Sequence, residues 1–181
     1  LNAGGLPAAN LARWNGVDWT SLALTGMGGA VYALGFDGSD QLYAGGAFQT
    51  AGGVAMKYVA RWDGLAWHAL GTGMDSSILA MAMAPDGTLY VGGAFGTVGG
   101  QPASFIARWD GSSWQPLGSG TNSMVRALAL DSTGKLYAGG MFTTAGGVTT
   151  NYIAQWDGTS WSALGTGMDS SVGALAVAQQ D

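Results

Sequence analysis

Short apolar stretches alternate with glycine-rich polar stretches along the whole chain. In the copy of this pattern that begins near Ala30, the apolar stretches predict strands over 31–36, 41–48, 58–62 and 67–70. Asp-Gly pairs at 37–38 and 63–64 predict tight turns between them, because glycine adopts positive φ without steric cost. The chain is therefore expected to be all-β.

The tryptophans show that this four-strand unit repeats. The first tryptophan of each copy recurs at spacings of 48, 47 and 47 residues, at Trp14, Trp62, Trp109 and Trp156. A second tryptophan follows each of them five residues later, at Trp19, Trp67, Trp114 and Trp161. A double glycine keeps the same period in the second strand, at Gly45 and Gly46, Gly92 and Gly93, and Gly139 and Gly140. Repetition at such a period is the signature of a repeat architecture.

A sheet of four short antiparallel strands cannot bury both of its apolar faces alone. Stacking such sheets radially buries each face against its neighbour, which predicts a β-propeller of four-stranded antiparallel blades with a period of about 47 residues. We expect a single propeller segment over 1–181. It would hold a partial blade (strands three and four) at 1–27, blades at 28–74, 75–121 and 122–168, and the first strand of a further blade at 169–181.

The motifs resemble kelch repeats, the type found in the central domain of galactose oxidase. In kelch repeats a double glycine ends the second strand, an aromatic-Asp pair closes the third and a tryptophan opens the fourth. Gly45 and Gly46, Trp62-Asp63 and Trp67 match these places, and Asp110 and Asp157 repeat the acid, although Asn15 replaces it in the first copy. WD-repeat propellers are the alternative, but they also require a Gly-His pair in each blade and have a shorter period.

The composition narrows the possible partners. All 11 acidic residues are aspartate and 33 residues are glycine, which favours turns over helices. Six Lys and Arg in a chain of net charge −5 form no basic patch, so we expect no nucleic-acid partner. No apolar run approaches the roughly 20 residues of a membrane span. Because only 9% of residues are charged, much of the surface is expected to meet other protein.

No catalytic residue, cofactor or metal site is predicted. The chain has one histidine and no cysteine, which excludes within it the several His and Tyr ligands and Cys-linked Tyr of the galactose oxidase copper site. The recurring Asp63, Asp110 and Asp157 could bind metal, but Asp-Gly is a strong hairpin signal and we interpret them as turn residues. His68 lies in an outer strand and is expected to be solvent-exposed and alone.

Three further sets of residues recur from copy to copy. The methionines of the segments between blades are expected to pack equivalently, at Met27, Met74, Met124 and Met168. One position of the first strand differs freely from copy to copy, and a site that breaks the symmetry would be sought there, at Tyr32, Leu79, Arg126 and Gly173. Aspartates in the turn after the first strand, Asp37, Asp86 and Asp131, are expected to shape that turn.

These observations predict a non-catalytic structural or protein-interaction scaffold of a secreted or cell-surface protein. A glycan-binding module with exposed aromatics is the alternative. The expected partners are other copies of the chain, or the rest of a longer chain, that complete the open blade. A head-to-tail contact that does not close would build a filament.

Overall fold

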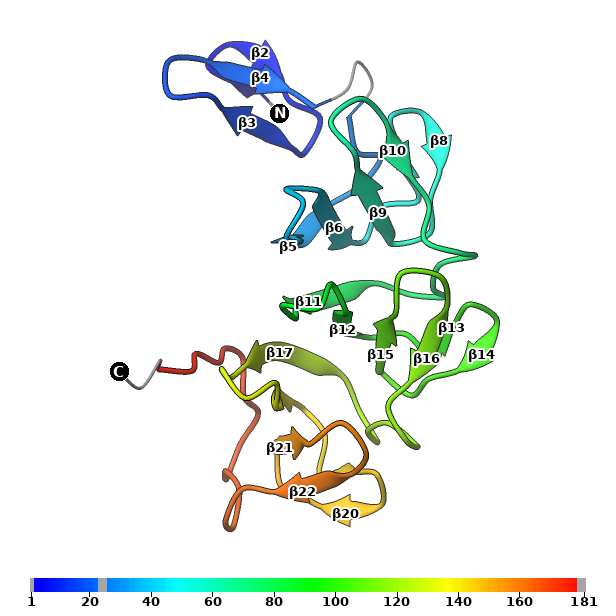
Figure 1. The fold of residues 1–181 in the computed structure, drawn as a ribbon, viewed down its shortest axis with the longest axis vertical. Helices are drawn as coiled ribbons and strands as arrows, with labels where there is room; N and C mark the ends of the chain where they lie inside the picture. The colour runs from blue at the N-terminus through cyan, green and yellow to red at the C-terminus, as the bar shows by residue number, and fades with distance from the viewer. Residues whose placement is uncertain (1, 23–25, 179–181) are drawn as a thin grey trace.

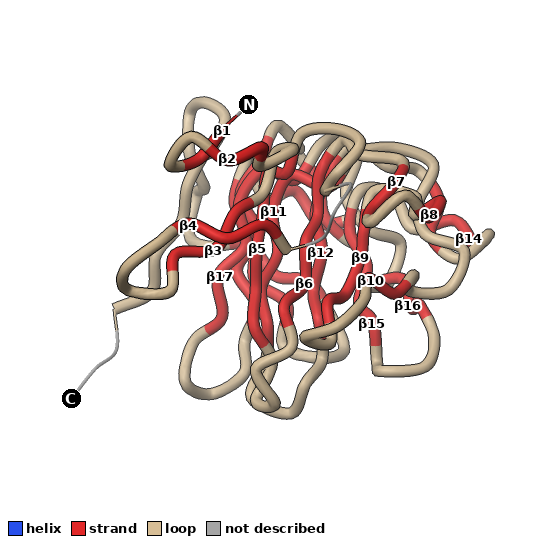
Figure 2. The backbone as a smooth tube through the Cα atoms, turned by 90° about the horizontal axis from the view of Figure 1, so that it is seen from above, coloured by secondary structure: helices blue, strands red, loops and turns tan. Residues whose placement is uncertain are grey.

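The computed structural model describes residues 2–22 and 26–178. All of the regular structure in these residues is β-strand, and none of them forms a helix (Figure 2). The all-β prediction is therefore confirmed. A membrane-crossing helix is accordingly not found in this part of the chain.

Three antiparallel sheets of four strands follow one another along the chain, and we call them blades 1, 2 and 3. Blade 1 consists of β5 (Val31–Phe36), β6 (Leu42–Gly46), β9 (Val59–Trp62) and β10 (Trp67–His68). Blade 2 consists of β11 (Ile78–Met83), β12 (Leu89–Gly93), β15 (Ile106–Trp109) and β16 (Trp114–Pro116). Blade 3 consists of β17 (Val125–Leu130), β18 (Leu136–Gly140), β21 (Ile153–Trp156) and β22 (Trp161–Ala163). In each blade the four strands lie side by side in chain order.

The blades are arranged as an arc. Figure 1 shows the first strands β5, β11 and β17 along the inner side and the later strands toward the outer side. The amino-terminal strands lie beside blade 1 at one end of the arc, and the carboxyl-terminal segment lies beside blade 3 at the other.

A two-stranded hairpin follows each second strand, where the sequence predicted only a loop. The hairpins are β7 (Thr50–Ala51) with β8 (Val54–Ala55), β13 (Thr97–Val98) with β14 (Gln101–Pro102), and β19 (Thr144–Ala145) with β20 (Val148–Thr149). In the first of them a Gly-Gly pair forms the turn, with φ of +60° at Gly52 and +82° at Gly53. Two successive residues with positive φ are what a two-residue hairpin turn requires.

These hairpins connect neighbouring blades. Single β-bridges join the preceding link to the hairpin, through the pairs Met27 with Ala51, Met74 with Val98 and Thr121 with Ala145. The expectation that Met124 is equivalent to the other link methionines is wrong, because Thr121 takes that place in the link before blade 3.

The amino-terminal residues form an incomplete unit, which we call the open unit. It contains a hairpin of β1 (Asn2–Ala3) and β2 (Leu6–Pro7) and a pair of β3 (Ala12–Trp14) and β4 (Trp19–Ser21). By the repeat, β3 and β4 correspond to third and fourth strands. No second strand is paired with β3 among the described residues.

The core lies between blades rather than within one blade. One buried cluster joins Tyr43 and Val59 of blade 1 to Leu89 and Val91 of blade 2. The next joins Tyr90 of blade 2 to residues of blade 3 in the same way. A third cluster lies between the open unit and blade 1. Each of the three clusters also holds a fully buried phenylalanine, two residues after the double glycine, at Phe48, Phe95 and Phe142. Each blade therefore depends on its neighbour for burial of its apolar faces.

The first glycine of each double glycine lets neighbouring blades approach closely. A Cβ placed on Gly92 would lie 2.5 Å from Cγ1 of Val125, in the first strand of the next blade. At Gly45 the corresponding distance is 2.7 Å to Cγ2 of Ile78. No real Cβ contact is that short, so a side chain at this position would push the two blades apart.

The segment Val172 to Ala178, predicted as a further first strand, occupies the corresponding place beside blade 3. A Cβ on Gly139 would lie 2.5 Å from Cγ1 of Val172 and 3.3 Å from Cδ1 of Leu175. The segment forms no strand, because among the described residues no second strand lies beside it to pair with.

Replacing Gly92 by alanine is expected to destabilise the protein by about 1–3 kcal/mol, through overpacking against Val125. Urea unfolding followed by tryptophan fluorescence measures the change. Gly35→Ala is the matched control, because a Cβ on this strand residue meets no atom within 4 Å. Equal midpoints for Gly92→Ala and the unmodified protein would contradict the steric role of Gly92.

Candidate interaction site

Each pair of tryptophans forms a unit in which the two rings contact each other. The ring centroids lie 5.2 Å apart for Trp109 and Trp114 and 5.3 Å apart for Trp156 and Trp161, and both pairs are tilted. The two tryptophans of a pair lie directly opposite each other on the third and fourth strands, so the contact between their rings stabilises the hairpin that joins these strands.

The second tryptophan of a pair also joins its blade to the preceding one. The Trp114 indole donates a 2.8 Å hydrogen bond to the Leu70 carbonyl, and the Trp161 indole donates a 2.9 Å bond to the Leu117 carbonyl. Both tryptophans of this pair also lie against Gly71, which follows Leu70 in the link between blades 1 and 2. A Cβ on Gly71 would be 3.4 Å from Trp114 and 3.5 Å from Trp109. The tryptophans are therefore part of the junction between blades.

The same pair is uncovered in the open unit. Trp14 and Trp19 are 51% and 40% exposed, whereas Trp114 and Trp161 are 7% and 6% exposed. At the other end of the arc, a Cβ on Gly165 would meet nothing within 4 Å among the described residues. One end thus has a tryptophan pair without a link, and the other has a link without a tryptophan pair.

A second contact between blades comes from the links and was missed at the sequence level. The Asp75 carboxylate accepts hydrogen bonds from the backbone N–H of Gly96 and Thr97 in the following blade, at 2.9 and 3.1 Å. The Asn122 side chain accepts the equivalent pair from Thr143 and Thr144. The available signal was the Asp or Asn that recurs at 75, 122 and 169.

The recurring Asp after each third strand holds the next hairpin. One oxygen of the Asp110 carboxylate accepts from the backbone N–H of both Ser112 and Ser113, at 2.9 and 2.8 Å. These bonds stabilise the ionised form and hold the pKa of Asp110 well below its ordinary value. Asp63 and Asp157 accept the same pair of bonds, and so does Asn15 in the open unit. The strands are joined by four residues, so the Asp side chain and not a two-residue turn shapes this hairpin.

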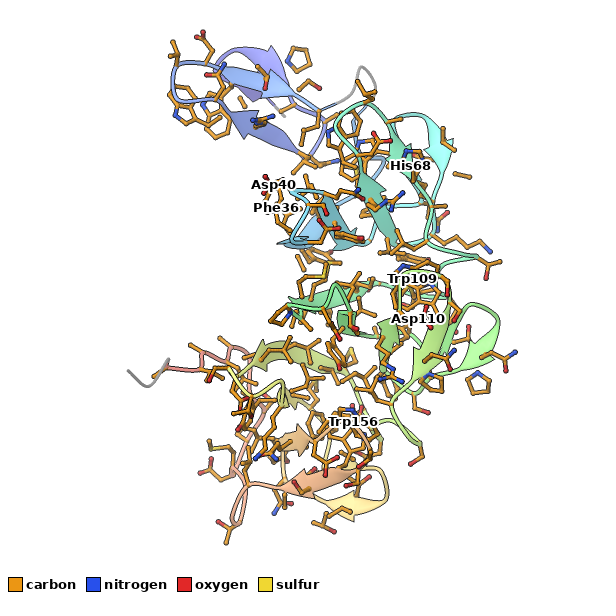
Figure 3. The ribbon with its side chains drawn as sticks, viewed as in Figure 1. Phe36, Asp40, His68, Trp109, Asp110 and Trp156 are labelled. Atoms are coloured by element: carbon orange, nitrogen blue, oxygen red, sulfur yellow. The ribbon has the colours of Figure 1, made fainter. Side chains whose placement is uncertain are left out.

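His68 has an acidic partner, although the sequence predicted that it is alone. Its Nε2 lies 2.6 Å from the Asp63 carboxylate, which also accepts from the N–H of Leu65 and Ala66. The histidine is 44% exposed on the outer strand β10 (Figure 3). Groups of three or more potential metal ligands are not found within residues 2–22 and 26–178.

The aspartates that follow the first strands are not all equivalent. Asp37 and Asp131 accept hydrogen bonds from the hydroxyl groups of Tyr43 and Tyr137 in the second strand of the same blade. Asp86 lies two residues further along its turn and accepts from the Thr88 N–H instead. The three aspartates all shape the turn, but only two of them reach a tyrosine.

The variable first-strand residues occupy a β-bulge. In each blade the pairing of first and second strand shifts at this residue, between Val31 and Ala33, Ile78 and Ala80, and Val125 and Ala127. The skipped residues are Tyr32, Leu79 and Arg126, and both Tyr32 and Arg126 are exposed. An extra residue that leaves the ladder is free of the packing constraints on its neighbours.

A cavity of about 760 Å³ lies between the open unit and blade 1. Ala12, Arg13 and Trp14 of β3 form one wall, and Leu34, Phe36 and Leu42 of blade 1 are among the residues of the other. Leu34 and Phe36 are 49% and 61% exposed. Figure 3 shows Phe36 and Asp40 on the side of blade 1 that faces the open unit. We call this cavity the slot.

A family model described as a domain of unknown function (DUF5122) beta-propeller matches residues 84–109, from the end of β11 to the end of β15. No curated protein matches the chain. With the repeated four-stranded sheets, the family match identifies the fold as a β-propeller type of repeat.

The hydrogen-bonded carboxylates make a prediction about pH. A lowered pKa contributes stability above the ordinary aspartate pKa of about 4, and this contribution is lost as pH falls toward the lowered value. We expect Asp110→Asn to keep the turn, as Asn15 does, and to weaken the loss of stability between pH 4 and pH 2.

Urea unfolding at pH 7, 4 and 2 measures this effect. Asp110→Ala is the matched control, because it removes the turn bonds and should lower the midpoint already at pH 7. An Asp110→Asn variant with the unchanged acid dependence would show that this carboxylate does not contribute.

Proposed function

We propose that the chain is a non-catalytic protein-interaction scaffold whose two open ends bind further blades. The observation that carries the proposal is the uncovered tryptophan pair of the open unit. Those blades belong to other copies of the chain or to the rest of a longer one. A secreted or cell-surface location and a kelch-like type of repeat are parts of the same proposal. The double glycines and the Trp-Asp pairs support the kelch-like type.

The junctions inside the chain indicate how the ends would fit together. The junctions of blade 1 with blade 2 and of blade 2 with blade 3 each use an indole-to-carbonyl bond, a backbone bond such as Gly99 N–H to Gly73 oxygen, and a link Asp or Asn. By the repeat, Leu164, Gly167 and Asp169 offer the link half of such a junction. Trp19, Gly4 and Asn2 offer the other half. A head-to-tail contact would therefore reuse contacts that already hold the blades together.

Light scattering after size-exclusion chromatography tests this proposal. We expect the chain at about 100 µM to form species at multiples of 18.2 kDa, since a head-to-tail contact repeats. Trp19→Ala should shift the mass toward one chain, because it removes the indole donor. Asp169→Lys should do the same from the opposite end, and it leaves the open unit unchanged.

Leu65→Ala is the matched control, because Leu65 is 89% exposed and belongs to neither half of the head-to-tail junction. The proposal of self-association would fail if the unmodified chain stayed at 18.2 kDa, or if Leu65→Ala dissociated the assembly as Trp19→Ala does.

Glycan binding is the second candidate. The exposed rings of Trp14 and Trp19 favour it, because a sugar can stack on an exposed aromatic face. It predicts binding on a glycan array that Trp14→Ala abolishes, together with a mass of one chain. Array binding that survives this substitution would count against the tryptophan pair as a sugar site.

A further inference from the structure

The slot has the position that a second strand occupies in the complete blades. At the junction of blades 1 and 2 the corresponding space holds β6, which pairs with β9 in a register that places Tyr43 opposite Arg61. Tyr43 is buried there among Leu89 and Val91 of blade 2. In the open unit β3 stands in the place of β9, and its edge toward the slot has no strand paired with it among the described residues.

The walls of the slot match the chemistry of a second strand. Leu34 and Phe36 are the counterparts of Met81 and Met83, which pack against the cluster that contains Tyr43. Arg13 is the counterpart of Arg61, which lies opposite Tyr43 in the strand register and whose charge acts on the Tyr43 hydroxyl. The slot therefore offers an apolar wall, a strand edge and a guanidinium for a tyrosine hydroxyl.

The fit also requires glycine. In the complete junction, a Cβ on Gly45 would lie 2.7 Å from Cγ2 of Ile78 and 2.9 Å from Sδ of Met81. Val31 and Leu34 are the counterparts of these two residues at the slot. A strand in the slot would contact Val31 and Leu34 at the position equivalent to Gly45, so only glycine leaves enough room at that position.

We propose that the slot accepts an extended β-strand from outside residues 1–181, with an apolar residue, tyrosine, a small residue and glycine in succession. The strand runs antiparallel to β3, with its apolar residue opposite Trp14, its tyrosine opposite Arg13 and its small residue opposite Ala12. Backbone hydrogen bonds to β3 supply affinity, and the tyrosine and glycine positions supply specificity. The inference rests on the proposed scaffold role and specifies the strand that completes the open unit.

A labelled peptide with the sequence of residues 135–142, Lys-Leu-Tyr-Ala-Gly-Gly-Met-Phe, is the probe. Fluorescence anisotropy measures its binding to the full chain and to the Asp169→Lys chain, in which the slot is intact. We expect saturable binding to both. Leu34→Asp in the chain should abolish it, because a carboxylate then faces the buried strand. Leu65→Asp is the matched control and should bind as the unmodified chain does, since Leu65 lies outside the slot.

The glycine requirement gives the sharpest outcome. Valine in place of the first peptide glycine should weaken binding by about tenfold or more, through overpacking against Val31 and Leu34. Phenylalanine in place of the tyrosine should weaken it by a smaller factor, since only the polar interaction of the hydroxyl with Arg13 is lost. Equal binding of the glycine and valine peptides, or equal binding to the Leu34→Asp and Leu65→Asp chains, would overturn the proposal.

The two proposals fail in different measurements. If the peptide does not bind while Trp19→Ala still dissociates the assembly, the strand slot is wrong and the scaffold role stands. If the peptide binds with the expected pattern to a chain that is always monomeric, self-association is wrong, and the slot still accepts a strand from a source other than a second copy.

Discussion

The close approach of each second strand to the first strand of the next blade is the contact on which the rest of the structure depends. The first glycine of the pair permits it, since a Cβ on Gly92 would lie only 2.5 Å from Val125. Only at this separation can Tyr43 and Tyr90 be buried by the next blade and the indoles of Trp114 and Trp161 reach the preceding link. The glycines, tyrosines and tryptophans share one period because they serve one junction.

The sequence was sufficient to predict the main strands of the blades and the period at which they repeat. Strand 31–36 has the predicted bounds, and third and fourth strands meet at the tryptophan pairs as the spacing indicated. These features depend on neighbours close in sequence, where periodicity and turn residues carry the signal. The small hairpins were missed because two-residue strands such as Thr50–Ala51 show no alternation.

Contacts between distant residues were harder to predict. Asp75 bonds residues 21 and 22 positions further on, so nothing in its own surroundings indicates a partner. The partner of His68 is hidden in the sequence for a different reason, since one oxygen of Asp63 serves its turn and only the second oxygen reaches the histidine. The slot could not be predicted from the sequence, because it depends on which strand of blade 1 lies opposite β3 in the folded structure.

The bulge in each first strand has a separate consequence for how such a protein diversifies. Tyr32, Leu79 and Arg126 leave the strand ladder, while the residues on both sides remain paired. The side chain at the bulge can therefore change one blade at a time, from aromatic to aliphatic to cationic, without disturbing the packing that joins the blades. A single repeated framework can in this way carry a different side chain at the bulge of every copy, much as antibody loops vary on a constant sandwich.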